Sequence, residues 1–200
     1  MKVLATIALA FGVATASASD RPNQAPSGTY VSDPAHTSVT WRIGHFGLSK
    51  YTARFAKVEA RLRWDHANPK KSTLAVEIDP RSVRTDFPSP EREDFDRKIG
   101  QTKDFLADKP IRFVSEEIVV TSPNSGRVAG YLTFRGKTRP ATLDVVFNGS
   151  IAEHPIEKVP KLGFSASMTI KRSAWGLTFA PTALSEDVEV SVEAEFMPST

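Results

Sequence analysis

Apolar and polar residues alternate along this chain from residue 38 almost to its end. In residues 57–64, every second side chain is apolar and the side chains between them are charged. A period of two indicates a β-strand with one buried and one solvated face. The pattern predicts eight such strands, over residues 38–43, 57–64, 74–78, 111–120, 128–134, 141–147, 164–170 and 188–196.

The polarity of the strands also predicts how they pair. Strands with one wet face favour an antiparallel sheet, because parallel sheets are usually buried on both faces. Eight strands must close into a barrel or stack into two sheets, since an open edge invites aggregation. The last strand, 188–196, is long and regular and carries no feature that would blunt an edge. We therefore predict an all-β fold, an eight-stranded antiparallel barrel.

One stretch departs from the alternation and predicts a helix over residues 89–99. Ser89 is a typical N-cap, and Pro90 is well placed in a first turn. Phe95 and Ile99 lie four residues apart on one helical face, and Gly100 would end the helix. We expect this short helix to cover part of the barrel, with a loop over 100–110.

The N-terminus predicts a secretory signal peptide over residues 1–18. Lys2 precedes an apolar run of about a dozen residues, and an Ala-Ser-Ala sequence follows, with cleavage expected after Ala18 or, as the competing site, Ala16. The apolar run is shorter than the roughly 20 residues that span a bilayer, and we expect no membrane-spanning segment. A buried N-terminal helix is the alternative. The predicted organisation is a signal peptide (1–18), a flexible N-terminus (19–27) and one barrel domain (28–197).

Composition narrows the classes of function. The chain has 26 Lys and Arg against 23 Asp and Glu and no basic run, so we expect no nucleic-acid partner. It contains no Cys, which excludes disulfides, thiolate metal sites, iron–sulfur clusters and cysteine nucleophiles. An exported protein without disulfides must be held together by its core.

Candidate chemistry is sparse. The four histidines lack the spacing of a zinc pair, although Asp33, His36 and His45 could converge on a metal. We favour a structural role for His36, bracing the start of the first strand. Residues 163–167 begin like the nucleophile elbow of a serine hydrolase but lack its final Gly. We therefore predict a protein that is not an enzyme and has no metal or cofactor.

The aromatic residues carry more information. An eight-stranded barrel is either filled by its side chains or just wide enough for one small ligand. Positions of inward parity mix small residues with large ones, which leaves room for a slot but also fits a tapering packed core. The large ones are Trp41, Phe113, Phe134, Phe147, Phe164 and Phe196, and the small ones are Gly130, Ala141, Ala166 and Ala194.

An ordered set of motifs resembles the YceI-like family over about residues 28–196. The N-terminal signature is Gly28-x-Tyr30-x-x-Asp33-Pro34-Ala35-His36-Thr37-Ser38-Val39-x-Trp41, then Ile43-x-His45-x-Gly47. Further matches are Pro110-x-x-Phe113-x-Ser115, Gly130-Tyr131-Leu132-Thr133-Phe134-Arg135-Gly136, Thr142-Leu143-Asp144, Asn148-Gly149, Leu162-Gly163-Phe164-Ser165-Ala166, Lys171-Arg172-Ser173-x-Trp175-Gly176-Leu177 and Val188-Glu189-Val190. Residues 91–105 match the family pattern only loosely.

The resemblance implies a lipocalin-like barrel in the periplasm that holds a long apolar molecule. Ligands associated with the family are polyisoprenoids, including isoprenoid quinones and prenyl phosphates, and fatty-acid amides. Members resemble carriers without established catalysis, and some are dimers, which leaves a homodimer open. Burial of a tail of about twenty carbons, at roughly 0.8 kcal/mol per CH₂, would suffice for binding.

These expectations select candidate ligand-binding residues. The predicted tail contacts are Trp41, Phe113, Phe134, Phe147, Phe164 and Met168, and the predicted head or mouth contacts are Arg42, His45 and Arg172. The first alternative is a periplasmic hydrolase or isomerase that acts on a lipid in the same pocket through His36 or His45. The second is a stress-related structural protein with a filled barrel.

Overall fold

The computed structural model describes residues 24–199. The predicted signal peptide, residues 1–18, lies outside the described residues. The last four residues of the segment expected to be flexible, 24–27, pack against the barrel. Ala25 is fully buried, its amide donates to the Ser150 hydroxyl at 3.3 Å, and the Tyr30 hydroxyl donates to the Pro26 carbonyl at 2.7 Å.

The described part of the chain contains ten strands and one α-helix. The strands are β1 (Gly28–His45), β2 (Ser49–Phe55), β3 (Val58–Trp64), β4 (Thr73–Ile78), β5 (Val83–Arg84), β6 (Ile111–Ser122), β7 (Ser125–Phe134), β8 (Lys137–Ile151), β9 (Lys161–Lys171) and β10 (Leu184–Pro198). The α-helix is α1 (Phe95–Gln101), and the 3-10 turns are η1 (Pro69–Lys71), η2 (Pro80–Ser82) and η3 (Arg172–Trp175).

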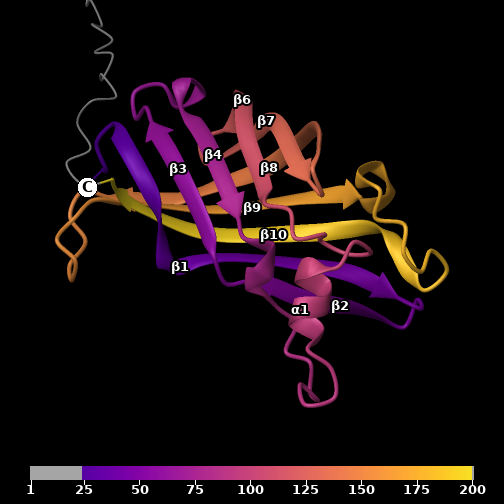
Figure 1. Cartoon of the computed structure of the whole chain (residues 1–200). Coiled ribbons are helices and arrows are strands. Elements are labelled where there is room, and N and C mark those ends of the chain that lie inside the picture. Colours follow the sequence, from indigo (N-terminus) through magenta and orange to yellow (C-terminus); the bar gives the residue numbers. More distant parts are fainter. Residues whose placement is uncertain (1–23, 200) are drawn as a thin grey trace, which may run out of the picture.

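The strands form a closed antiparallel barrel. The sheet order is β10-β9-β8-β7-β6-β4-β3-β1-β2-β5, and β10 also pairs with β1, which closes a ring of eight strands. β2 and β5 extend from the far part of β1, outside this ring. The predicted eight-stranded all-β barrel is therefore confirmed, with two strands added (Figure 1).

β1 changes its neighbour halfway along its length. Residues 28–31 pair with β3, whereas residues 39–45 pair with β2, and β10 follows both parts of β1 on the other side. The register with β10 shifts between Ser32 and Thr37, which is the position of a β-bulge. Because β1 leaves β3 at this bulge, the far part of β1 continues into β2 and β5 instead. α1 lies beside β2 (Figure 1) and packs against η2 and the end of β5.

The helix begins later than the sequence pattern predicts. α1 starts at Phe95, and the segment expected to open it forms only a turn, in which the Arg92 amide donates to the Ser89 carbonyl. The N-cap is Asp94, whose carboxylate accepts from the Arg97 amide at 2.9 Å. The expectation that Ser89 caps the helix is therefore wrong. Asp94 satisfies the free Arg97 amide in the first turn, directly before the helical face on which Phe95 and Ile99 pack against the core.

Asp96 holds the helix against the barrel extension. Its carboxylate accepts hydrogen bonds from the Thr85 amide at 2.8 Å and from the Thr85 hydroxyl at 2.6 Å, just after β5. Gly100 allows the close approach to η2, because a Cβ atom there would lie 2.7 Å from the Pro80 carbonyl oxygen. α1 is thereby fixed over the end of the barrel where β1 pairs with β2.

Candidate functional site: an apolar cavity in the barrel

The barrel encloses a cavity of about 770 Å³. This volume falls within the range of roughly 300–1,000 Å³ that small-molecule sites occupy. The lining comes from the inward faces of the barrel strands and β2, from α1 and from the loops at both ends. The sequence left open an alternative in which side chains fill the barrel. A cavity of this volume contradicts that alternative.

Eight of the nine predicted binding residues line the cavity. They are Trp41, His45, Phe113, Phe134, Phe147, Phe164, Met168 and Arg172. Arg42 is the exception, since it is exposed and contributes nothing to the lining. Arg42 was predicted to bind the ligand because it lies near a strand end, but successive side chains of a strand point to opposite faces. Trp41 and Ile43 face the cavity, so the Arg42 side chain between them points outward.

Sequence reasoning missed the part of the lining that comes from irregular segments. These residues are Phe46, Phe87, Phe95, Lys98, Ile99, Phe105, Leu106, Leu177, Phe179, Ala180 and Ala183. Loops and short helices have no period of two that would reveal which side chains face inward. The density of Phe over residues 87–105 was the available signal, because apolar rings in a charged segment need a surface to pack against.

Aromatic pairs assemble one end of the cavity, which we call the mouth and define by His45, Phe46, Phe87, Phe105 and Phe179. The rings of Phe105 and Phe179 lie 5.0 Å apart, and those of Phe87 and Phe95 lie 5.2 Å apart. The Phe46 amide donates to the Ala183 carbonyl at 2.7 Å, which joins the β1–β2 turn to the β9–β10 loop. Phe46 remains 62% exposed and Phe179 46%, so apolar side chains reach the surface at this end.

Arg172 is buried beneath the mouth with a side chain that organises the β9–β10 loop. Its Nε donates to the Ser185 carbonyl at 2.8 Å, and its Nη1 donates to the carbonyls of Leu177 at 2.9 Å and Phe179 at 2.8 Å. Its Nη2 donates to the Leu184 carbonyl at 3.2 Å. Backbone carbonyls therefore use most of the donors that would otherwise bind a ligand head.

The other cationic lining residue at the mouth is also paired. Lys98 Nζ donates to the Glu93 carboxylate at 2.5 Å and lies 5.6 Å from the centre of the Phe95 ring. The His45 ring meets the Phe46 ring edge-on, with centroids 4.7 Å apart. Among the described residues, no Asp or Glu lines the cavity. Acid–base chemistry inside it would therefore lack a carboxylate.

The opposite end of the cavity, which we call the distal end, is built around Trp64. Its ring stacks on Phe147 at 5.6 Å and meets Phe164 edge-on at 5.9 Å. The Phe147 amide donates to the Asn124 carbonyl at 2.7 Å, which brings the β6–β7 turn to the same end. The polar lining residues here are neutral, and they are Thr37, Ser72, Ser122, Asn124 and Ser125.

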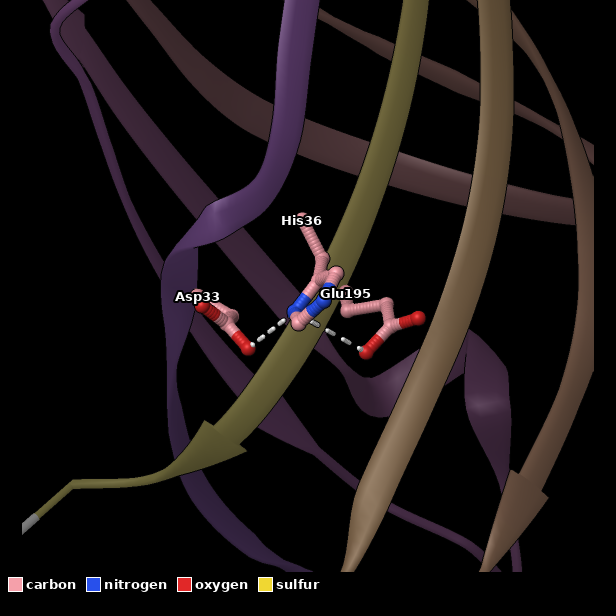
Figure 2. Close-up of side chains that lie close together, drawn as sticks. All are labelled: Asp33, His36 and Glu195. Carbon is pink, nitrogen blue, oxygen red and sulfur yellow. Dashed lines mark hydrogen bonds and ion pairs between the residues drawn. The ribbon is translucent and has the colours of Figure 1, made fainter.

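A second cluster of polar side chains lies outside the cavity, at the bulge of β1 (Figure 2). The His36 Nδ1 atom lies 2.8 Å from the Asp33 Oδ2 atom and 3.8 Å from the Glu195 Oε2 atom. Lys161 Nζ lies 2.5 Å from the same Asp33 oxygen and 2.6 Å from the Glu157 Oε2 atom. A buried ammonium thus occupies the position that a bound cation would need.

The sequence-based metal alternative of Asp33, His36 and His45 does not form. His45 lies nine residues beyond His36 along β1, about 30 Å away at roughly 3.3 Å per residue, and it lines the mouth instead. Glu195 takes its place beside the other two, with the three ligating atoms within 4.8 Å of one another. Lys161 Nζ lies within 4 Å of the carboxylates of Asp33, Glu157 and Glu195, so the cluster ties the bulge of β1 to β9 and β10.

Hydrogen bonding sets the protonation of the cluster. Burial would raise the pKa of Asp33, but hydrogen bonds from His36 and Lys161 outweigh it and hold that pKa well below its usual range. Burial would lower the pKa of Lys161, but hydrogen bonds to Asp33 and Glu157 raise it. The hydrogen bond to Asp33 raises the pKa of His36, with the charges of Asp33 and Glu195 adding to it.

Comparison with known proteins decides the family. The model of the YceI-like domain matches residues 30–196. This chain belongs to the YceI-like family. A UPF0312 protein from Pseudomonas fluorescens is 30% identical to this YceI-like chain over 198 residues, which cover 93% of this chain and 94% of the relative.

Solved structures share the fold of this YceI-like protein. BcnA from Burkholderia cenocepacia superposes with a TM-score of 0.70 at 21% identity, covering 82% of this chain and 98% of that one. A polyisoprenoid binding domain from Saccharophagus degradans has a TM-score of 0.53 at 13% identity, covering 85% and 98%. Within residues 24–199, no helix has the length and apolarity needed to cross a membrane.

Proposed function

We propose that this YceI-like protein is a periplasmic carrier that holds a polyisoprenoid or a similar long-chain amphiphile inside its barrel. The observation that carries the proposal is the cavity of about 770 Å³, whose lining is mostly apolar and lacks carboxylates among the described residues. The shared fold with a polyisoprenoid binding domain supports it. The signal-peptide pattern of residues 1–18 supports export.

The energetics favour a long apolar ligand. Each buried CH₂ contributes roughly 0.8 kcal/mol, so a tail of about twenty carbons gains far more than the cost of ordering it. Met168 and Phe164 of β9 and Trp41 of β1 offer such a tail the apolar surface that water would otherwise meet. Binding of this kind needs no catalytic group, and we propose a binding protein rather than an enzyme.

The test is to identify what the mature protein carries. Protein purified without detergent is analysed by intact mass spectrometry under native conditions, and the bound molecule is extracted with organic solvent and identified. We expect a long-chain isoprenoid or lipid in near-stoichiometric amount. Protein that is free of lipid and takes up no isoprenoid in a direct titration would contradict the proposal.

A pair of variants on β9 locates the binding. Met168→Lys places a charge in the cavity, and we expect it to abolish retention of the lipid. Thr169→Lys is the matched control, because the neighbouring residue is exposed and lies on the outer face of the same strand. Equal retention by both variants, each folded by circular dichroism, would place the ligand outside the barrel.

A further inference from the structure

Three apolar side chains are exposed on two neighbouring loops at the mouth. In the β1–β2 turn, Leu48 is 87% exposed and Phe46 62%, and in the β9–β10 loop Phe179 is 46% exposed. The hydrogen bond from the Phe46 amide to the Ala183 carbonyl joins the two loops, and both lie beyond the same end of the barrel (Figure 1). Exposed apolar residues that gather at one place mark sites of interaction with ligands, proteins or membranes.

The fold holds both loops in fixed conformations. Phe46 has a φ of 51°, in the left-handed region that bulky residues rarely adopt, and Gly47 follows it with a φ of 69°. In the other loop, the buried Arg172 donates to the Phe179 carbonyl at 2.8 Å. A strained backbone persists only where the surrounding structure enforces it, and such strain is concentrated at functional sites.

The exposed apolar surface is continuous with the cavity. Phe46 and Phe179 line the cavity as well as reaching solvent, whereas Leu48 belongs to the outside alone. An apolar molecule that enters or leaves the barrel at this end therefore meets these side chains. A long-chain amphiphile partitions from water into a lipid bilayer, so a bilayer is the surface from which such a molecule is taken.

The chain segments that form this end of the barrel are basic. Residues 34–58, 118–143 and 158–185 contain Lys and Arg but no Asp or Glu. They include the β1–β2 turn, the β7–β8 turn and the β9–β10 loop, because β1, β7 and β9 all end at the mouth. An anionic surface placed against these three loops would therefore meet cations from each segment.

The β7–β8 turn brings its cations to the β9–β10 loop. Lys137 Nζ lies beside Gly176, where a Cβ atom would be only 2.8 Å from it, and Arg139 Nε donates to the Ala174 carbonyl at 2.6 Å. Cations of the β7–β8 turn thus lie next to the segment that carries the exposed Phe179.

The acids at the start of β10 are largely matched by cations. Asp187 lies 2.5 Å from Lys171 Nζ, and Glu189 pairs with Lys50. Glu186 accepts hydrogen bonds from the amide and hydroxyl of Ser173. These acids therefore leave the neighbouring loops with an excess of positive charge.

We propose that the mouth docks onto the surface of an anionic lipid bilayer, with Phe46, Leu48 and Phe179 inserted below the headgroups and the surrounding cations facing them. The inference rests on the proposed carrier function, because it names the bilayer as the partner with which the barrel exchanges its long-chain molecule. In this orientation the opening faces the bilayer, and the molecule passes between the two without crossing water.

Ile156 provides a matched control at the other end of the barrel. It is 84% exposed, close to the value for Leu48, and lies in the loop between β8 and β9. That loop carries acids, since Glu153 pairs with Lys158 at 3.3 Å and Glu157 with Lys161 at 2.6 Å. An exposed apolar side chain is therefore present at both ends, but only the mouth combines it with an excess of cations.

A fluorescent probe at each position tests the orientation. The chain contains no Cys, so Leu48→Cys and Ile156→Cys each provide a single site for an environment-sensitive fluorophore such as NBD. The labelled mature proteins are mixed with phosphatidylcholine vesicles that contain about 30% phosphatidylglycerol. We expect the emission of the probe at position 48 to rise and shift to the blue, and the emission at position 156 to stay unchanged.

Unlabelled variants measure what each feature contributes to docking. In co-sedimentation with the same vesicles, we expect Leu48→Ser to bind at least about fivefold more weakly and Ile156→Ser to bind as the wild type does. Lys137→Gln should weaken binding about fivefold, whereas Arg127→Gln, an equal loss of charge at the other end of β7, should change it little. Raising the salt to about 0.5 M should also weaken binding.

The carrier function is measured separately, without vesicles, by titration with an isoprenoid. Leu48→Ser should retain wild-type affinity there, because Leu48 does not line the cavity. Protein that binds the isoprenoid but leaves both probes unchanged with vesicles would overturn the docking proposal and leave the carrier function intact. An equal response of the two probes, or equal binding to vesicles of pure phosphatidylcholine, would overturn the assignment of the mouth to an anionic bilayer.

Discussion

The ammonium of Lys161, the first residue of β9, lies 2.5 Å from the carboxylate of Asp33 in the bulge of β1. β10 runs between these two strands, so the ion pair crosses a strand to which each is hydrogen-bonded. The two side chains are only 5% and 8% exposed. The pair therefore fixes the position at which β1 leaves β3.

Removing one partner of this pair should destabilise the fold. Asp33→Asn leaves the Lys161 ammonium buried without its main carboxylate, and we expect a loss of about 3 kcal/mol in the free energy of unfolding. Denaturant unfolding of the single variants and of the Asp33→Asn, Lys161→Met double variant measures the coupling. We expect the double variant to be more stable than Asp33→Asn alone. Additive losses would show that the pair does not act as a unit.

His36 should make stability depend on pH above neutrality. Its hydrogen bond to Asp33, together with the charges of Asp33 and Glu195, raises its pKa above 6.5, and the charge of Lys161 opposes this. The stabilisation is therefore complete below pH of about 6.5 and is lost as the pH rises through the higher pKa of the folded state. Unfolding curves of wild type and His36→Gln should differ most near pH 6 and converge toward pH 9. A constant difference would exclude this linkage.

Arg172 should matter for stability rather than for direct contact with a ligand head. Arg172→Met removes four hydrogen bonds to carbonyls of the β9–β10 loop and of β10, and we expect a loss of about 3 kcal/mol or more. Arg42→Ala is the control, because that side chain is exposed, and it should change stability by less than about 0.5 kcal/mol. Thermal unfolding with and without bound lipid measures both. An Arg172→Met variant with wild-type stability but weakened ligand affinity would return Arg172 to a head-group role.

The sequence determined the barrel and most of its inner surface. Because the side-chain period of a strand is two, alternation assigns each residue to a face before any contact is known. Phe113 on β6 and Phe147 on β8 could therefore be placed inside from their own neighbours alone. The same rule, applied strictly, would have placed Arg42 outside.

Only the tertiary structure decided where β1 changes its neighbour and which segments complete the two ends of the barrel. The change of neighbour in β1, the extra strands β2 and β5, and the Asp33–Lys161 pair depend on contacts between distant parts of the chain, 128 residues apart for that pair. Irregular segments such as those at the mouth have no sequence periodicity. The contact between the Phe105 and Phe179 rings therefore could not be predicted from the sequence, because it depends on how the strands place the two loops. Local sequence sets which face a residue presents. Long-range packing sets what that face meets.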